Sequence, residues 1–322
     1  MAQSGIQIAD DTSEARGAAT GMVVLFFAAC VLGFAPILVK ASELGPQAIG
    51  FWRLTFALPL LAVWLWFEMR RARREEAARD SAAKPVAWTP ILLAGLFFAG
   101  DLAFWHVGIK ITTAANATLL ANLTPIIVAV AAFFLFGERI TRPFLAAGAL
   151  ALLGAVLLSA ANVQFAPERL TGDIFSVLTS FWYASYLLAV RAARRAGAAT
   201  VQVMFWSTAA AAPILLLVTL AVGEPLTPES LGGWAPLIAL GVIVHVGGQG
   251  GIAFGLGRTP AALATLIILI QPVVAAAAGW VLFGEALVAI QWLGAALVLA
   301  GVYAAQRFRP PSSTAPSDGA KP

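Results

Sequence analysis

Asp101 is the residue of this sequence whose charge would be most costly to bury at its predicted position. It lies about midway along the apolar segment 89–109, where an ionised carboxylate is expensive and usually marks a functional site. Such a carboxyl group can pair with a ligand ammonium group or take up a proton. The alternative is a neutral Asp101 that hydrogen-bonds to a neighbouring helix. Trp105, four residues on, shares its helical face, and His106 lies about 100° further round. We predict a ligand cavity that includes Asp101, Trp105 and His106.

A proline interrupts the apolar segment 113–136 beside two polar residues. Thr118, Asn122 and Pro125 follow the spacing i, i+4, i+7, which forms one stripe on a helix. Pro125 has no N–H, so the carbonyl of Ala121 needs another partner or cavity water. We predict that Pro125 is a hinge and that Thr118 and Asn122 line the cavity beside it. The alternatives are a simple packing kink at Pro125 and an Asn122 that only satisfies the freed carbonyl.

The apolar segment 261–283 repeats this arrangement. Pro272 leaves the carbonyl of Ile268 without its helical partner, and Gln271 stands next to that proline. We predict that Pro272 is the second hinge and that Gln271 is a cavity residue.

Aromatic and amide side chains in two other segments complete the predicted site. Trp182 and Tyr183 lie well inside the segment 172–190, although such aromatics can also be membrane-interface anchors. Gln249 lies on the segment 234–255, opposite a ridge of small residues that predicts close helix packing: Gly247, Gly251 and Gly255. We therefore expect Gln249 to point into the cavity.

These residues require a scaffold of apolar helices. Of the 322 residues, 60% are hydrophobic and 11% are charged, against about a quarter charged in soluble proteins, which disfavours a soluble all-helical protein. Runs of roughly 20 apolar residues can cross a bilayer. They predict an all-α integral membrane protein with ten transmembrane helices, near residues 18–39, 47–67, 89–109, 113–136, 143–162, 172–190, 201–222, 234–255, 261–283 and 288–306.

The basic residues predict the orientation of these ten helices. Of 20 Lys and Arg residues, 16 fall on the side that holds both termini, three on the other side, and Arg53 within a helix. Because basic residues stay on the cytoplasmic side, both termini should be cytoplasmic, with the chain in the cell inner membrane. We expect Arg53 to snorkel outward to lipid headgroups. The net charge of +4 then reflects topology and contact with membrane lipid, and no nucleic-acid partner is expected.

An internal duplication organises the ten helices. The stretch LTPIIVAVAAFFLFGE (123–138) recurs as IQPVVAAAAGWVLFGE (270–285), and FWRLTFALP (51–59) overlays FWSTAAAAP (205–213). Each half holds five helices, an odd number, so the second half must be inverted in the membrane, a pattern typical of transporters. We predict a cytoplasmic N-terminal tail, two five-helix repeats and a disordered cytoplasmic tail, over residues 1–17, 18–162, 171–306 and 307–322.

The duplication makes two further predictions. Pro125 and Pro272 should face each other near the middle of the membrane. Glu138 and Glu285, each closing a Gly-Glu pair, should cap the helix that follows, because a carboxylate is favoured at a helix N-terminus.

The doubled pattern resembles the EamA-type ten-helix branch of the drug/metabolite transporter (DMT) superfamily. Each half has a proline in its fourth helix, a closing Gly-Glu pair and a Gly-rich fifth helix. Further matches are Gly33, Lys40, Arg53 and TTAANATLL (112–120), whereas Leu32 and the Phe-Ala-Pro after Gly33 depart from many relatives. The resemblance implies a transporter in a family that mostly contains exporters and permeases of amino acids, nucleotide-related metabolites and drugs.

Three classes of function are weighed on these features. The leading one is an alternating-access carrier that exports a small metabolite such as an amino acid, with protons as a candidate coupling ion and uncoupled facilitation as the alternative. An intramembrane enzyme is disfavoured, because the sequence has no His-Glu-x-x-His, Gly-x-Ser-x-Gly or phosphate-binding loop. A non-transporting scaffold or sensor is the third. No cofactor or metal is expected, and a monomer suffices, although two copies can also associate.

Overall fold

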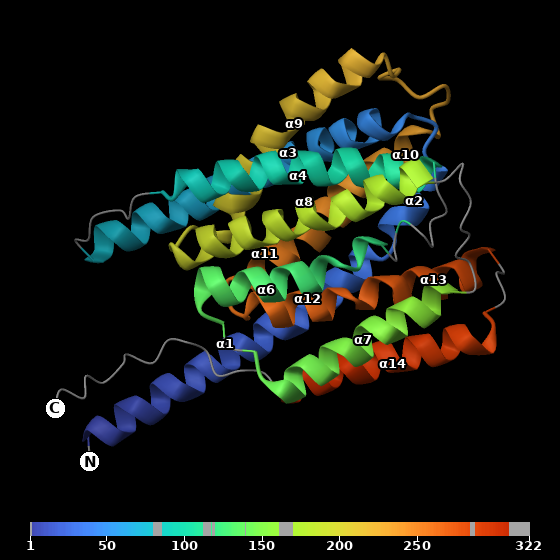
Figure 1. Cartoon of the computed structure of the whole chain (residues 1–322). Helices are drawn as coiled ribbons and strands as arrows, with labels where there is room; N and C mark the ends of the chain where they lie inside the picture. Colours follow the sequence, from blue (N-terminus) through green and yellow to red (C-terminus); the bar gives the residue numbers. More distant parts are fainter. Residues whose placement is uncertain are drawn as a thin grey trace.

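The computed structural model describes residues 2–79, 86–111, 117, 120–138, 140–160, 170–283 and 287–308, and every regular element in these ranges is a helix (Figure 1). Nine helices in this part of the chain are long and apolar enough to cross a membrane, and Thr124–Phe136 is a shorter apolar helix. The predicted class, an all-α integral membrane protein, is confirmed.

The first repeat runs from α1 to α7. Its helices are α1 (Ala2–Leu32), α2 (Ala35–Ala41), α3 (Pro46–Arg79), α4 (Trp88–Ile111), α6 (Thr124–Phe136) and α7 (Arg142–Ala160). The second repeat comprises α8 (Leu170–Arg195), α9 (Thr200–Val222), α10 (Trp234–Ala239), the π-helix η2 (Leu240–Gln249), α11 (Gly250–Leu256), α12 (Ala261–Ile268), α13 (Ile270–Phe283) and α14 (Ala289–Arg307).

Prolines mark the helix breaks that matter for the site. Pro125 lies in the first turn of α6, and Pro272 lies in the first turn of α13. A proline is tolerated in a first turn because the N–H that it lacks would have no helical partner there. The ninth apolar segment accordingly forms two helices, α12 and α13, with a turn at Leu269, and in the fourth segment a turn at 122–123 precedes α6.

The contacts between helices of the two repeats follow an inverted two-fold relation. Helices α3 and α7 each pack on their counterparts α9 and α14, and α6 packs on α12, the helix before its counterpart α13. Helix α1 packs on η2 and α11 as α8 packs on α4. A Cβ on Gly154 would lie 2.6 Å from the Gly294 carbonyl oxygen, and one on Gly301 would lie 2.8 Å from that of Ala147. Residue numbers therefore rise along α7 in the direction in which they fall along α14. These counterparts run antiparallel, as inverted repeats require, and lie side by side in Figure 1.

The small-residue ridge of the eighth segment differs from the prediction at one position. Gly251 and Gly255 face α1, as expected, but a Cβ on Gly247 would meet no atom within 4 Å. Gly248 takes its place against Leu32, because the wider turns of the π-helix η2 rotate this stretch relative to an α-helix.

Candidate functional site

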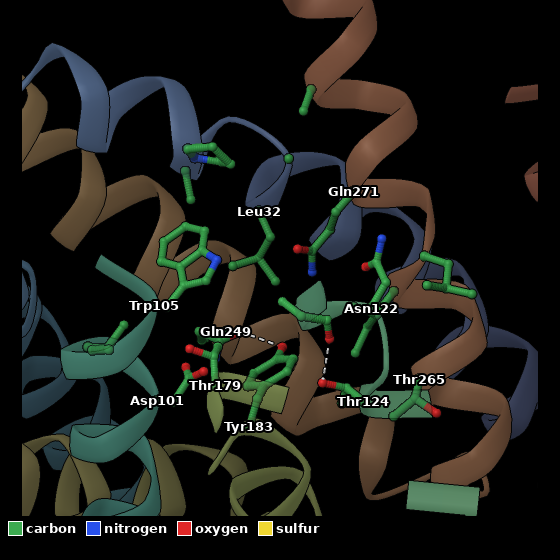
Figure 2. Close-up of a pocket in the computed structure, with 18 of the residues that line it drawn as sticks. Leu32, Asp101, Trp105, Asn122, Thr124, Thr179, Tyr183, Gln249, Thr265 and Gln271 are labelled. Carbon is green, nitrogen blue, oxygen red and sulfur yellow. Dashed lines mark hydrogen bonds between the residues drawn. The ribbon is translucent and has the colours of Figure 1, made fainter. Parts of the chain in front are cut away.

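A cavity of about 90 Å³, which widens to about 800 Å³ when the space at its opening is included, lies where the two repeats meet (Figure 2). Three helix breaks border it: the turn between α1 and α2, the turn before α6, and the turn at Leu269 between α12 and α13. Backbone that leaves its helix at membrane depth is tolerated where it lines a cavity. The breaks therefore expose polar backbone to a single space inside the bundle.

Seven of the predicted residues line this cavity. They come from α4, the turn before α6, α6 itself, α8, η2 and α13: Asp101, Trp105, Asn122, Pro125, Tyr183, Gln249 and Gln271. Figure 2 shows that all of these except Pro125, which it does not label, surround a common space. The Tyr183 hydroxyl donates a hydrogen bond to Oε1 of Gln249 at 3.4 Å, which joins α8 to η2 across the floor of the site.

Three other predicted residues lie off the cavity wall, and a fourth falls outside the described ranges. His106 is fully buried against α3, with Nδ1 3.1 Å from the carbonyl oxygen of Pro46. Trp182 packs between α8 and α4, where the absence of a side chain on Gly100 makes room for its ring. Pro272 is buried but is not a lining residue, so the two prolines do not face each other across the cavity. Thr118 lies outside the residues that the structure describes.

Arg53 is the lining residue that the sequence interpretation misplaced. It was expected to reach outward to headgroups, but its side chain is only 3% exposed and lies on the cavity wall. Its guanidinium carbon stands 5.9 Å from the centroid of the Phe98 ring, beside the turn of α4 that carries Asp101. The signal that could have found it is the charge itself. Arg53 is seven residues into its helix, about 10 Å below the helix start, too deep for a charge without a function.

Two lining side chains have buried nitrogens without hydrogen-bond partners, Nε of Arg53 and Nδ2 of Asn122. The carbonyl freed by Pro125 is satisfied by another residue: the hydroxyl of Thr124 donates to the Ala121 oxygen at 2.8 Å (Figure 2). Asn122 therefore does not serve the freed carbonyl, and its amide remains available to a molecule in the cavity.

No metal centre accompanies these groups in the part of the chain that the structure describes. No three of the described His, Cys, Asp or Glu side chains lie close enough together to share an ion. The lining instead offers one guanidinium, one carboxyl, several amides and hydroxyls, and an apolar surface that includes Leu32, Phe98 and Leu102. This combination suits a small organic molecule with both polar and apolar parts.

Comparison with known proteins agrees with the repeat structure. Two stretches of the chain, residues 19–160 and 170–305, each match the model of the EamA-like transporter family. The chain belongs to this family. The EamA-like architecture thus accounts for most of the sequence, one repeat for each match.

Individual relatives of this EamA-like transporter are distant but similar in length. An uncharacterized transporter of Bacillus subtilis is 28% identical over 80% of this chain and 83% of its own length. A probable amino-acid metabolite efflux pump of Salmonella typhimurium is 28% identical over 63% of this chain and 71% of its own. A solved crystal structure superposes with a TM-score of 0.70 at 21% identity, covering 89% of this chain and 98% of that one, which shows the same fold.

The repeats of this EamA-like transporter are also joined at the end of α6. Glu138 was expected to cap the following helix, but it caps α12 of the other repeat, accepting hydrogen bonds from the N–H groups of Ala261 at 3.0 Å and Ala262 at 3.3 Å. Its Oε1 also pairs with Arg191 of α8 at 3.3 Å. Glu285 lies outside the described residues. We call these contacts of Glu138 the Glu138 clamp.

A comparable cap joins the repeats at the other end of the bundle. Glu224, after α9, accepts hydrogen bonds from the N–H groups of Gln47 and Ala48 at the start of α3, both at 2.9 Å. Each end of the bundle thus has a carboxylate of one repeat bound to the N-terminus of a helix of the other.

Proposed function

We propose that this chain is an alternating-access carrier that exports a small amphipathic metabolite, such as a neutral or aromatic amino acid, through the cavity between its repeats. The observation that carries the proposal is the position of the cavity. Helix breaks from both repeats border it, and side chains from both repeats line it. Sites at the junction of inverted repeats, built from discontinuous helices, are typical of secondary transporters.

The amino-acid form of the proposal rests on the lining and on one relative. Aromatic and apolar residues beside amide groups suit a solute with an apolar side chain and polar ends. The relative described as a probable amino-acid metabolite efflux pump supports the same class and an outward direction. The distribution of basic residues supports an inner-membrane protein with both termini in the cytoplasm.

A transport assay with a cavity-filling variant tests the carrier function. The full chain is reconstituted in proteoliposomes, and efflux of a panel of amino acids and other metabolites is measured. Ala275→Phe introduces a large side chain at the cavity wall, whereas Val281→Phe places the same side chain on the same helix at a position 73% exposed. We expect the first variant to abolish flux and the second to retain it. Equal flux in both variants would show that the cavity is not the pathway.

Asp101 is the candidate for proton coupling, because it is the carboxyl group on the cavity wall. A group that takes up a proton in each cycle makes flux depend on pH. Asp101→Asn should flatten the flux profile from about pH 5 to about pH 8 if the carrier is coupled. An unchanged profile in this variant would eliminate the proton role and leave uncoupled facilitation.

A scaffold or sensor without transport is the alternative function. Its mark would be central polar residues packed against one another with no space between them. The cavity that Asp101, Asn122, Gln249 and Gln271 share weighs against it.

A further inference from the structure

Arg53 and Asp101 place two groups of opposite charge on the cavity wall, and no described residue of the protein occupies their hydrogen-bonding positions. Their exposed fractions are 3% and 7%, so both are nearly removed from water. They stand further apart than the 4.0 Å of an ion pair, yet close enough for each to feel the charge of the other. Among the described residues, neither side chain has a hydrogen-bond partner, and Nε of Arg53 is fully buried without one.

Burying two such charged groups costs free energy unless other groups form hydrogen bonds with them. A buried guanidinium or carboxylate without hydrogen bonds loses much of its solvation, and removing one member of a compensating pair costs more than keeping both. The attraction between the two groups offsets part of this cost, but their donor and acceptor positions stay open. An occupant that supplies an anion to Arg53 and a cation to Asp101 would fill those positions.

We infer that the cavity recognises a zwitterion, with Arg53 binding the carboxylate of the solute and Asp101 binding its ammonium group. This assignment rests on the proposed carrier function and narrows its substrate to molecules that carry both charges near each other. In an α-amino acid the two groups are attached to one carbon, so the residues that receive them must be neighbours. Arg53 meets this condition because it lies beside Phe98, one turn before Asp101 on α4.

The geometry of the two groups also fits the assignment. A guanidinium presents a planar fork of donors that matches the two oxygens of a carboxylate. The unpaired amide nitrogen of Asn122 supplies one more donor on the same cavity wall. The apolar lining, including Leu32 and Leu102, is left for the side chain of the solute.

The inference predicts rejection of solutes that carry only one charge. A simple amine fills Asp101 and leaves Arg53 unpaired, and a simple carboxylic acid does the reverse. Because a site built around buried polar groups rejects analogues that leave those groups unpaired, discrimination should be strong. Loss of one charge-assisted contact corresponds to about 10- to 100-fold in affinity.

Three ligands with the same side chain test this inference: leucine, 3-methylbutylamine without the carboxylate, and 4-methylpentanoate without the ammonium group. Binding to the full chain in nanodiscs is measured by calorimetry. The wild type should bind leucine about 10- to 100-fold more tightly than either analogue. Arg53→Gln should weaken leucine binding by a similar factor and leave the amine unchanged. Asp101→Asn should weaken leucine and leave the acid unchanged.

This crossed pattern cannot come from misfolding, because a misfolded variant weakens all three ligands together. Arg53→Lys keeps the charge without the fork and should retain a preference for leucine over the amine. Arg258→Gln, an arginine that stacks on Phe254 away from the cavity, should match the wild type. Equal binding of all three ligands by the wild type, or an Arg53→Gln protein that still prefers leucine over the amine, overturns the inference.

Failure of the carrier function is a different result. If the wild type binds none of the three ligands, the zwitterion assignment is wrong, while the metabolite panel and the Ala275→Phe variant decide separately whether the cavity transports another solute.

Discussion

The Glu138 clamp should control how easily the two repeats separate at the end of α6. One carboxylate there holds two N–H groups of α12 and the guanidinium of Arg191. Glu138→Gln keeps one acceptor oxygen, but its amide nitrogen replaces the other and faces a second donor. Arg191 loses its ionic partner and keeps its bond to the Leu256 carbonyl.

The magnitude follows from these contacts. Charge-assisted hydrogen bonds contribute about 1.5–3 kcal/mol each, and removing one member of a buried pair costs about 3–5 kcal/mol. Because Arg191 keeps one bond and is 13% exposed, we take the lower end, about 3 kcal/mol. That free energy corresponds to roughly a 100-fold shift toward states in which α12 is released.

Hydrogen–deuterium exchange of the first turn of α12 measures this shift directly, since the N–H groups of Ala261 and Ala262 are the ones that Glu138 binds. Exchange there should accelerate by up to roughly 100-fold in Glu138→Gln. The matched control is Glu224→Gln, which removes the carboxylate from the first turn of α3 and should leave α12 unchanged. Unaltered exchange in α12 of the Glu138 variant would refute the clamp.

Two further predictions concern stability. In Gly154→Ala the new Cβ would lie 2.5 Å from the nitrogen of Val298 on α14, about 0.9 Å inside ordinary contact. The two helices must then separate, which should lower stability in a thermal unfolding assay by about 1–3 kcal/mol. Gly148→Ala on the same helix is the control and should be neutral, because its Cβ meets only side-chain carbons at 3.5 Å or more. Hydrogen bonds from the hydroxyl and then the N–H of Ser230 lower the pKa of Glu43, so their contribution to stability is present above the ordinary pKa and is lost as pH falls through the lowered one. The difference in melting temperature between wild type and Ser230→Ala should therefore shrink toward acidic pH, and a constant difference would contradict this.

The breaks and the inverted repeats could be predicted because they depend on local chemistry. A proline removes one N–H wherever it stands, so Pro125 and Pro272 mark places where their apolar segments can break. The length of an apolar run and the odd number of helices per half are likewise properties of the chain alone. The matching Pro59 and Pro213 lie inside α3 and α9 without ending them, so a proline marks a weak point and neighbouring helices decide whether it breaks.

The orientation of Arg53 could not be predicted in the same way. In a soluble helix the polar face reveals which side is outside, but lipid and protein interior are both apolar. The side of α3 away from the bundle is apolar as well, with Leu60 43% and Val63 55% exposed. Which side faces inward is set by packing on α4 and α9, which depends on the whole fold.

Longer-range contacts explain the other differences. Glu138 precedes α7 in the chain, yet α12 of the other repeat presents its N-terminus closer. His106 and Asp101 both lie on α4, but the nearby Pro46 carbonyl takes up the imidazole, so only the carboxyl remains on the cavity wall. Each of these contacts joins residues more than 50 positions apart, beyond the reach of any local pattern.

The two repeats supply matching helix breaks but unequal charges. Arg53 occupies the position of Ser207 in the duplicated stretch, and Ser207 is an uncharged residue that donates to the Met204 carbonyl within its own helix. Asp101 and Arg53 both belong to the first repeat, whereas the second lines the cavity with amides and hydroxyls such as Gln249 and Gln271. In a carrier whose repeats rock against each other, a zwitterion held by Arg53 and Asp101 would travel with the first repeat. Only the neutral contacts of the solute with the second repeat would then break and form during the cycle. The charges of the solute would stay paired with Arg53 and Asp101 in both conformations.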